Sequence, residues 1–272
     1  GGGGGRAGRA GPGVGGPPAG LGAPAHPRGG GGGAGGLGKN GHVLVEGPGF
    51  EVRAGEVVGI AAVEGNGQRS ILRAVAGLEH RPDIRVHGTV AFVPEDRSTE
   101  GLVGELTLTE NLVLGLGAGA PWVRGALVDW DAARARTAEL LAEHDVRATG
   151  ADGEAGSLSG GNQQKLVMAR AFEGHPEVLV AENPTRGLDI RATAEVHRRL
   201  REAARRGMGV LVWSSDLDEV LELADRVLVV HAGVVSAVPA DADRAQVGRM
   251  MLRVREGEAR SGKGEGGVSG ER

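Results

Sequence analysis

The feature that most constrains this chain is a repeated alternation between short apolar segments and segments with helical spacing. Continuous apolar runs, each followed by an amphipathic helix, indicate parallel strands that are buried on both faces. The expected strands are 56–63, 89–93, 178–181, 209–213 and 226–230. The expected helices are 70–78, 130–144, 161–173, 192–206 and 216–224. The sequence therefore predicts an α/β fold in which a mostly parallel sheet is flanked by helices.

Glycine is unevenly distributed along the chain, and this sets the expected domain boundaries. Residues 1–41 consist mainly of Gly, Pro, Ala and Arg. Such a segment cannot bury enough apolar surface to offset the entropy lost on ordering. We therefore expect residues 1–41 to be disordered, residues 42–253 to fold as one domain, and residues 254–272 to form a second disordered tail.

The composition excludes several classes of function. The chain has no cysteine, so disulfides, thiolate zinc sites and a cysteine nucleophile are ruled out. Aromatic residues make up 2 % and the net charge is −4, which argues against nucleic acid as a partner. The arginines between 198 and 206 fit an exposed helix face better than a nucleic-acid patch. No apolar run is long enough to span a membrane, and the first residues lack an apolar signal-peptide core.

The loop after the first expected strand is a candidate phosphate cradle. Ligands on parallel sheets bind at the carboxyl ends of strands, which directs attention to loops 64–70, 182–189 and 213–216. The first loop consists of Glu64, Gly65, Asn66, Gly67, Gln68, Arg69 and Ser70. Glycines allow backbone N–H groups to approach phosphates, and the following helix N-terminus adds partial positive charge.

This loop departs from the full phosphate-loop pattern G-x-x-x-x-G-K-[ST]. Ala62 replaces the first glycine, Gln68 replaces the lysine, and Arg69 replaces the hydroxyl residue, with Ser70 one position later. Arg69 could replace part of the lost positive charge. On these residues alone, a nucleotide site and an ordinary Asn-Gly turn between strand and helix both stay open.

A more specific motif, LSGGNQQK, lies at residues 158–165 and opens an expected helix. Ser159 offers a hydroxyl, Gly160 and Gly161 expose backbone N–H groups, and the helix N-terminus can meet an anion. Asn162 and Gln163 complete the motif. The alternative is a simple serine N-cap with a glycine-rich entry.

The segment 178–189 reads VLVAENPTRGLD and resembles the Walker B strand and D-loop of ATP-binding cassette (ABC) proteins. Together with LSGGN, VEGNGQ at 63–68 and VPEDR at 93–97, it is similar to the ATP-binding subunits of importers for simple sugars and nucleosides. Within these, it looks like the second cassette of the tandem ATPase polypeptides. The resemblance covers roughly residues 43–240. It implies a P-loop NTPase-like ABC nucleotide-binding domain with a small helical subdomain at about 100–175.

The resemblance also implies partners and cofactors. Two cassettes dimerise head to tail, and each ATP is held with Mg²⁺ between the phosphate loop of one cassette and the LSGG signature of the other. Permease transmembrane subunits receive the motion, and a solute-binding protein delivers the cargo. The chain is then expected at the cytoplasmic face of the cell membrane, bound peripherally through the permease.

Several positions differ from those of a competent family site. Glu182 stands at the magnesium-binding Asp, with Ser70 as a second candidate metal ligand. Asn183 stands at the Glu that activates water, and Ser215 at the switch histidine. Asparagine cannot act as a general base at neutral pH. Glu95 lies at the Q-loop and Asp189 in the D-loop.

The resemblance therefore implies an asymmetric mechanism. Ser159, Gly160, Gly161, Asn162 and Gln163 would cap the γ-phosphate of ATP bound to another cassette, whereas loop 64–70 would bind nucleotide weakly, with slow or no turnover. The alternatives are a non-catalytic binding or regulatory module, a truncated fragment, or a soluble cassette acting in DNA repair or translation. The last would need coiled-coil insertions or basic linkers, which the sequence lacks. We expect the first cassette either on a separate chain or in sequence absent from this one.

Overall fold

The computed structural model describes residues 41–117 and 120–252, which belong to one compact unit. The predicted disordered segments, 1–41 and 254–272, lie outside the described residues except for Gly41. Their disorder and the boundaries of the folded domain stay predictions.

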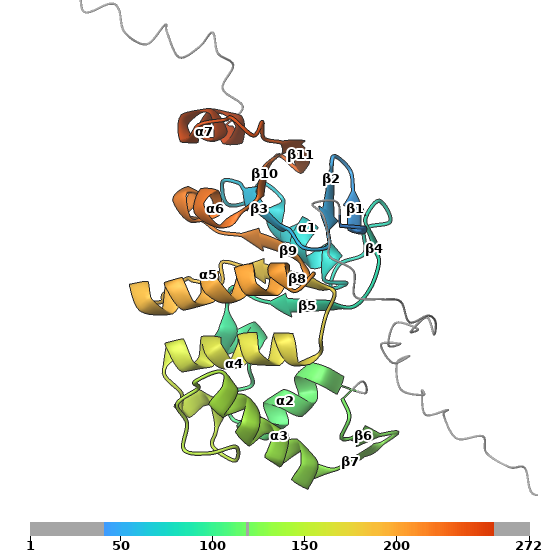
Figure 1. The fold of residues 1–272 in the computed structure, drawn as a ribbon, viewed down its shortest axis with the longest axis vertical. Coiled ribbons are helices and arrows are strands. Elements are labelled where there is room, and N and C mark those ends of the chain that lie inside the picture. The colour runs from blue at the N-terminus through green and yellow to red at the C-terminus, as the bar shows by residue number, and fades with distance from the viewer. Residues whose placement is uncertain (1–40, 118–119, 253–272) are drawn as a thin grey trace, which may run out of the picture. The chain divides into compact units, whose positions relative to one another are not determined.

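A six-stranded sheet forms the centre of this unit, with strand order β11-β10-β3-β9-β8-β5 (Figure 1). The strands are β3 (Val57–Ala61), β5 (Val90–Val93), β8 (Val178–Glu182), β9 (Gly209–Trp213), β10 (Arg226–His231) and β11 (Val234–Ala237). Strands β10, β3, β9, β8 and β5 run parallel, and β11 pairs antiparallel with β10. The parallel strands are those predicted from the apolar runs, so the predicted fold class is confirmed.

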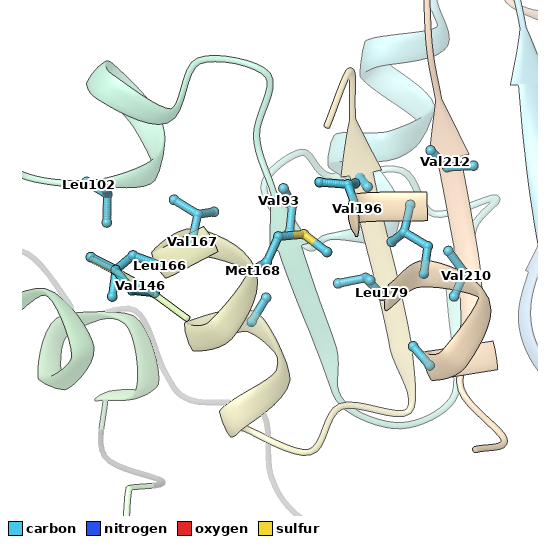
Figure 2. Close-up of a cluster of buried hydrophobic side chains, with 14 of the residues drawn as sticks. Val93, Leu102, Val146, Leu166, Val167, Met168, Leu179, Val196, Val210 and Val212 are labelled. Atoms are coloured by element: carbon cyan, nitrogen blue, oxygen red, sulfur yellow. The ribbon is translucent and has the colours of Figure 1, made fainter. Parts of the chain in front are cut away.

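The sheet is buried on both faces because successive side chains of each strand point to opposite sides. In β9, Val210 and Val212 join one hydrophobic core, whereas Leu211 and Trp213 join the other. Figure 2 shows part of the first core, where Val210 and Val212 lie near Leu179 of β8 and face side chains from the covering helices.

Helices cover the two faces of the sheet. On one face, α1 (Gln68–Val75) packs its Ile71, Leu72 and Val75 into the second core. On the other face lie α4 (Gly160–Glu173), α5 (Ile190–Arg205) and α6 (Leu217–Leu223). Gly59 of β3 allows α6 to approach closely, because a Cβ there would lie 2.7 Å from a methyl carbon of Val220.

A small antiparallel sheet lies over the second core. It has the order β2-β1-β4 and consists of β1 (Val43–Gly47), β2 (Phe50–Arg53) and β4 (Arg85–Val86). Its buried residues Leu44, Val45, Phe50 and Val52 complete that core. This sheet was not predicted from the sequence, because its strands are short and mix charged with apolar residues.

A helical cluster occupies the region between β5 and α4. It contains a π-helical turn (Arg97–Gly101), α2 (Leu108–Leu116), the hairpin of β6 (Val123–Arg124) and β7 (Leu127–Val128), α3 (Trp130–Glu143) and a 3₁₀ turn (Ala155–Ser157). The cluster has its own core around Leu112, Trp122, Leu140 and Ala169, and it lies beside α4 (Figure 1). It falls inside the segment at about 100–175 predicted to be a helical subdomain.

The described part of the chain ends in α7 (Arg244–Leu252), which packs Val247 against the β10 side of the sheet. Within residues 41–117 and 120–252, we find no helix with the length and hydropathy needed to cross a bilayer.

Candidate functional site

The loops that follow β5, β8 and β9 meet at the carboxyl edge of the sheet. The backbone N–H of Asn183 donates to the carbonyl of Trp213 (2.7 Å), and its side-chain Nδ2 donates to Glu95 (3.0 Å). The N–H of Ser215 donates to Asn183 Oδ1 (2.6 Å). Parallel strands carry their loops to one edge, so the sequence correctly placed loops 182–189 and 213–216 together.

The glycine-rich loop after β3 joins α1 at the same edge. Gly67 is the N-cap of α1 and adopts the left-handed conformation (φ 96°), which glycine allows at little cost. No side chain caps this helix, so its first N–H groups are available to an anion. Glu64 and Gly65 are exposed at the loop tip.

Asn66 anchors the glycine-rich loop to the turn between β10 and β11. Its Oδ1 accepts the N–H of Ala232 (2.9 Å), and its backbone carbonyl accepts the N–H of Gly233 (2.8 Å). Its Nδ2 donates to the carbonyl of Val63 (3.0 Å). Asn66 therefore holds the loop in shape and is not itself free for phosphate.

The next three residues of α1 point in different directions. Gln68 is 1 % exposed, and neither its amide oxygen nor its amide nitrogen has a hydrogen-bond partner among the described residues. The guanidinium of Arg69 reaches Glu182 at 3.5 Å and Glu100 at 3.6 Å. The hydroxyl of Ser70 donates to Glu79 (2.5 Å).

These contacts do not fit the predicted magnesium ligands. The structure does not bring Ser70 to Glu182, because the Ser70 hydroxyl faces Glu79 and the Glu182 carboxylate faces arginine. Among the residues that the structure describes, no cluster of three or more His, Asp or Glu side chains is placed to hold a metal. The charged side chains described at this edge therefore form ion pairs around the buried Glu182.

Glu182, the last residue of β8, is fully buried between two arginines. Arg73, one turn along α1, lies 3.5 Å from Glu182 and 2.5 Å from Glu100. Burial raises the pKa of Glu182, and the charges of Arg73 and Arg69 oppose this rise. Burial lowers the pKa of Arg73, but the attraction of Glu182 and Glu100 outweighs it and raises the pKa overall.

Asn183 holds three loops together rather than activating water. It adopts a left-handed conformation (φ 40°), which asparagine tolerates better than most residues. Both ends of its amide are occupied, by the N–H of Ser215 and by Glu95, and Glu95 also pairs with Arg186. A carboxylate at 183 could not accept and donate in this way, so the asparagine suits a structural tie.

The LSGGN segment presents an open helix N-terminus. Ser159 is exposed at the N-cap of α4, and its hydroxyl does not cap the helix. Ser159 Oγ accepts from Asn162 Nδ2 (3.0 Å), so its own proton is free to donate. Nothing lies within 4 Å of a Cβ built on Gly161. Gln163 ties the start of α4 to the preceding 3₁₀ turn, because its Nε2 donates to the carbonyl of Ala155 (3.3 Å).

Arg97 adds positive charge beside this helix tip. The resemblance places Arg97 at the Q-loop, but its position beside Gly160 was not predicted. A Cβ on Gly160 would lie 2.6 Å from Arg97 Nη2. Arg97 Nη1 donates to the carbonyl of Arg186 (3.2 Å), linking the VPEDR segment to the 182–189 loop. Asp189 ends this loop as the N-cap of α5, accepting the N–H of Ala192 (2.8 Å). Its carboxylate is therefore engaged in capping.

A second feature that the sequence did not reveal is a polar cluster behind Asn183. Glu219 of α6 accepts hydrogen bonds from Thr185 (2.8 Å), His197 (2.6 Å) and Ser214 (2.5 Å). These groups line a hollow of about 430 Å³. The cluster joins the 182–189 loop, α5 and the end of β9 through one carboxylate.

Comparison with known proteins identifies the class to which this fold and edge belong. Residues 45–186 match the family model described as ABC transporter. The match spans more than half of the chain, so the chain belongs to the ABC transporter family.

Among its relatives is the nucleoside import ATP-binding protein NupA of Lactococcus lactis subsp. cremoris. The two are 37 % identical over 78 % of this chain and 46 % of NupA. The ribose import ATP-binding protein RbsA 2 of Streptomyces avermitilis is 40 % identical over 69 % of this chain and 40 % of that protein. The chain thus spans less than half the length of both relatives.

Solved structures show the same fold. A structure described as an ATP-binding subunit of an ABC transporter aligns with a TM-score of 0.60 and 25 % identity, covering 75 % of this chain and 93 % of that one. The ATP-binding cassette MJ0796, a dimer bound to ADP and phosphate, aligns with a TM-score of 0.60 and 22 % identity, covering 71 % of this chain and 89 % of that one.

Proposed function

We propose that this chain is an ATP-binding subunit that energises an ABC importer for simple sugars or nucleosides. Its LSGGN segment completes the nucleotide site of a second cassette, and its own site turns over slowly or not at all. The observation that carries the proposal is the contrast between the open tip of α4 at Ser159 and the closed, ion-paired edge at Glu182.

The signature tip has the chemistry of a phosphate cap. The N-terminus of α4 supplies partial positive charge, Ser159 a free hydroxyl proton, and Arg97 a full positive charge beside Gly160. Phosphoryl transfer depends mainly on positioning and charge stabilisation, which such a tip can lend to a nucleotide bound elsewhere. The magnesium ion, which neutralises phosphate charge, then belongs to the partner cassette's site.

At this chain's own edge, the positions of the family's water-activating Glu and switch histidine hold Asn183 and Ser215. The side-chain amide of Asn183 is hydrogen-bonded to the N–H of Ser215 and to Glu95. Ser215 has no imidazole that could act as the switch histidine does. Without a base, hydrolysis at this edge would lose the contribution of about 10²–10⁴-fold typical of general base catalysis. The edge is therefore suited to holding nucleotide and not to cleaving it.

The names of the relatives support the importer role. NupA is a nucleoside importer protein and RbsA 2 a ribose importer protein, which agrees with the LSGGN and VPEDR segments of this chain. The partners that follow are a second cassette and permease transmembrane subunits, with a solute-binding protein acting through the permease. The chain would lie at the cytoplasmic face of the membrane, held peripherally by the permease.

A graft tests this function. Residues 42–252 replace the matched segment of NupA, and we expect the rest of NupA to supply the second cassette. Ser159→Arg should lower ATP hydrolysis by roughly 100-fold, because it places bulk and charge where the γ-phosphate must lie. Ser157→Arg, at an exposed serine two residues away, is the matched control and should retain activity. Hydrolysis that survives Ser159→Arg but is lost in Gln68→Ala would overturn the asymmetry.

The same graft distinguishes a chain that completes a catalytic site from a purely regulatory module. Such a module would bind its partner without completing a catalytic site. Hydrolysis by the graft would then be insensitive to Ser159→Arg and to Gln68→Ala alike.

A further inference from the structure

Arg69 of α1 stands where an ABC phosphate loop carries its metal-binding hydroxyl residue. This position therefore carries a positively charged side chain. Arg69 directs its guanidinium to the fully buried carboxylate of Glu182 (3.5 Å) and to Glu100 (3.6 Å). In the family pattern, a divalent cation lies between the hydroxyl residue and the strand carboxylate. Here, a positive charge fixed to the chain lies between the same two positions.

Arg73 adds a second positive charge to the place where the family pattern has a divalent cation. It reaches Glu182 at 3.5 Å and Glu100 at 2.5 Å, so two guanidiniums and two carboxylates form one cluster with no net charge. A buried carboxylate is costly unless it is paired, and this pairing is supplied from within the chain. A divalent cation at Glu182 would have to displace Arg69 against the repulsion of both arginines.

The loop nevertheless keeps features that receive an anion. Gly67 opens α1 in a left-handed conformation, and the helix has no side-chain cap. The Gln68 side chain at the start of α1 is 1 % exposed, and both polar atoms of its amide lack a partner among the described residues. A buried amide left unpaired is costly, so a ligand that satisfied it would gain free energy. Arg69 keeps a half-exposed guanidinium that can turn toward phosphate oxygens.

We propose that Arg69 takes the place of the divalent cation, so that this loop binds a nucleoside triphosphate without magnesium. The inference rests on the proposed function only in assigning loop 64–70 to a nucleotide. It concerns this chain's own edge and not the signature tip, so the two can fail separately.

The first test needs no variant. The affinity of the full chain for ATP is measured by isothermal titration calorimetry, once with excess EDTA and once with millimolar Mg²⁺. The two dissociation constants should agree to within about twofold. Binding that is about tenfold or more tighter with Mg²⁺ overturns the proposal. Failure to bind ATP in either buffer also overturns it, while leaving the Ser159 test of the signature untouched.

The second test asks whether Arg69 is the group responsible. Arg69→Thr restores a hydroxyl and should weaken binding in EDTA about tenfold, which corresponds to about 1.4 kcal/mol, and Mg²⁺ should recover part of the loss. Arg69→Lys keeps the charge and should stay closer to the parent chain. Arg206→Thr is the matched control because Arg206 is 76 % exposed at the end of α5 and pairs with Glu202. Arg69→Thr binding that equals the parent in EDTA contradicts the assignment.

Discussion

Replacing Glu219 with glutamine should destabilise the domain, because this carboxylate joins three separate segments. Glu219 accepts hydrogen bonds from Thr185 (2.8 Å), His197 (2.6 Å) and Ser214 (2.5 Å), and its side chain is only 9 % exposed. Burial raises the pKa of Glu219, but these hydrogen bonds together outweigh it and lower the pKa overall. The carboxylate is therefore ionised at neutral pH.

The magnitude follows from the bonds that glutamine cannot make. Glutamine keeps one acceptor oxygen but places an NH₂ group against the remaining donors. A hydrogen bond to a charged group contributes about 1.5–3 kcal/mol, so Glu219→Gln should cost about 3 kcal/mol. For a folded region of this size, the midpoint of thermal unfolding should fall by roughly 6–12 °C.

The assay is thermal and urea unfolding followed by circular dichroism. Glu222→Gln is the matched control, because Glu222 lies three residues later on α6 with its side chain 67 % exposed. The control should change the free energy of unfolding by less than about 0.5 kcal/mol. Equal stability of the two variants would refute the reasoning, since it would mean that the buried network contributes no more than a surface carboxylate.

Further predictions concern pH, packing and catalysis. Burial lowers the pKa of His144 to about 4 from an ordinary 6.5, so the folded state resists protonation. Stability from this group should be complete above about pH 6.5 and fall by about 2 kcal/mol at pH 5, a slope that His144→Gln should flatten in urea titrations. Gly59→Ala should cost about 1–3 kcal/mol in the same assay because the new methyl meets α6. Asn183→Glu should not restore phosphate release by the chain alone, since it breaks the ties to Ser215 and Glu95; sustained release would contradict this.

Much of the fold could be predicted because its sheet is parallel and buried on both faces. Such strands are continuous apolar runs, and the residues of β8 and β9 are buried throughout. Once strands and helices alternate, the rule that loops meet at the carboxyl edge places 64–70, 182–189 and 213–216 together. The antiparallel sheet β2-β1-β4 was not predicted, because β4 has only two residues and β2 only four. Such short segments carry little periodicity.

The candidate site was predicted less completely, because the directions of its side chains depend on partners distant in the sequence. The motifs predicted that Glu182 and Arg69 belong to one site, but nothing in the spacing shows that they form an ion pair across 113 positions. Ser70 was a reasonable metal candidate until Glu79 provided an acceptor for its hydroxyl. Side-chain pairing of this kind is decided by tertiary packing, and a local pattern cannot supply it.

The role of Asn183 shows the same limit. The sequence indicates that asparagine cannot serve as a base, which is a statement about what the residue cannot do. Its positive role, tying Ser215 and Glu95 to the 182–189 loop, requires the left-handed backbone at 183 and the position of β9 beside β8. Neither is visible from residue types alone.

The measurement that tests the central claim most directly is the chemical accessibility of the α4 tip during nucleotide trapping. This chain has no cysteine, so Ser159→Cys introduces a single reactive thiol into the NupA graft once the cysteines of the remaining part are replaced. With ATP bound and hydrolysis blocked by vanadate, alkylation of the thiol should slow about tenfold or more, whereas a thiol at Ser157 should react as before. An unchanged rate at position 159 in the trapped, assembled graft would contradict the account.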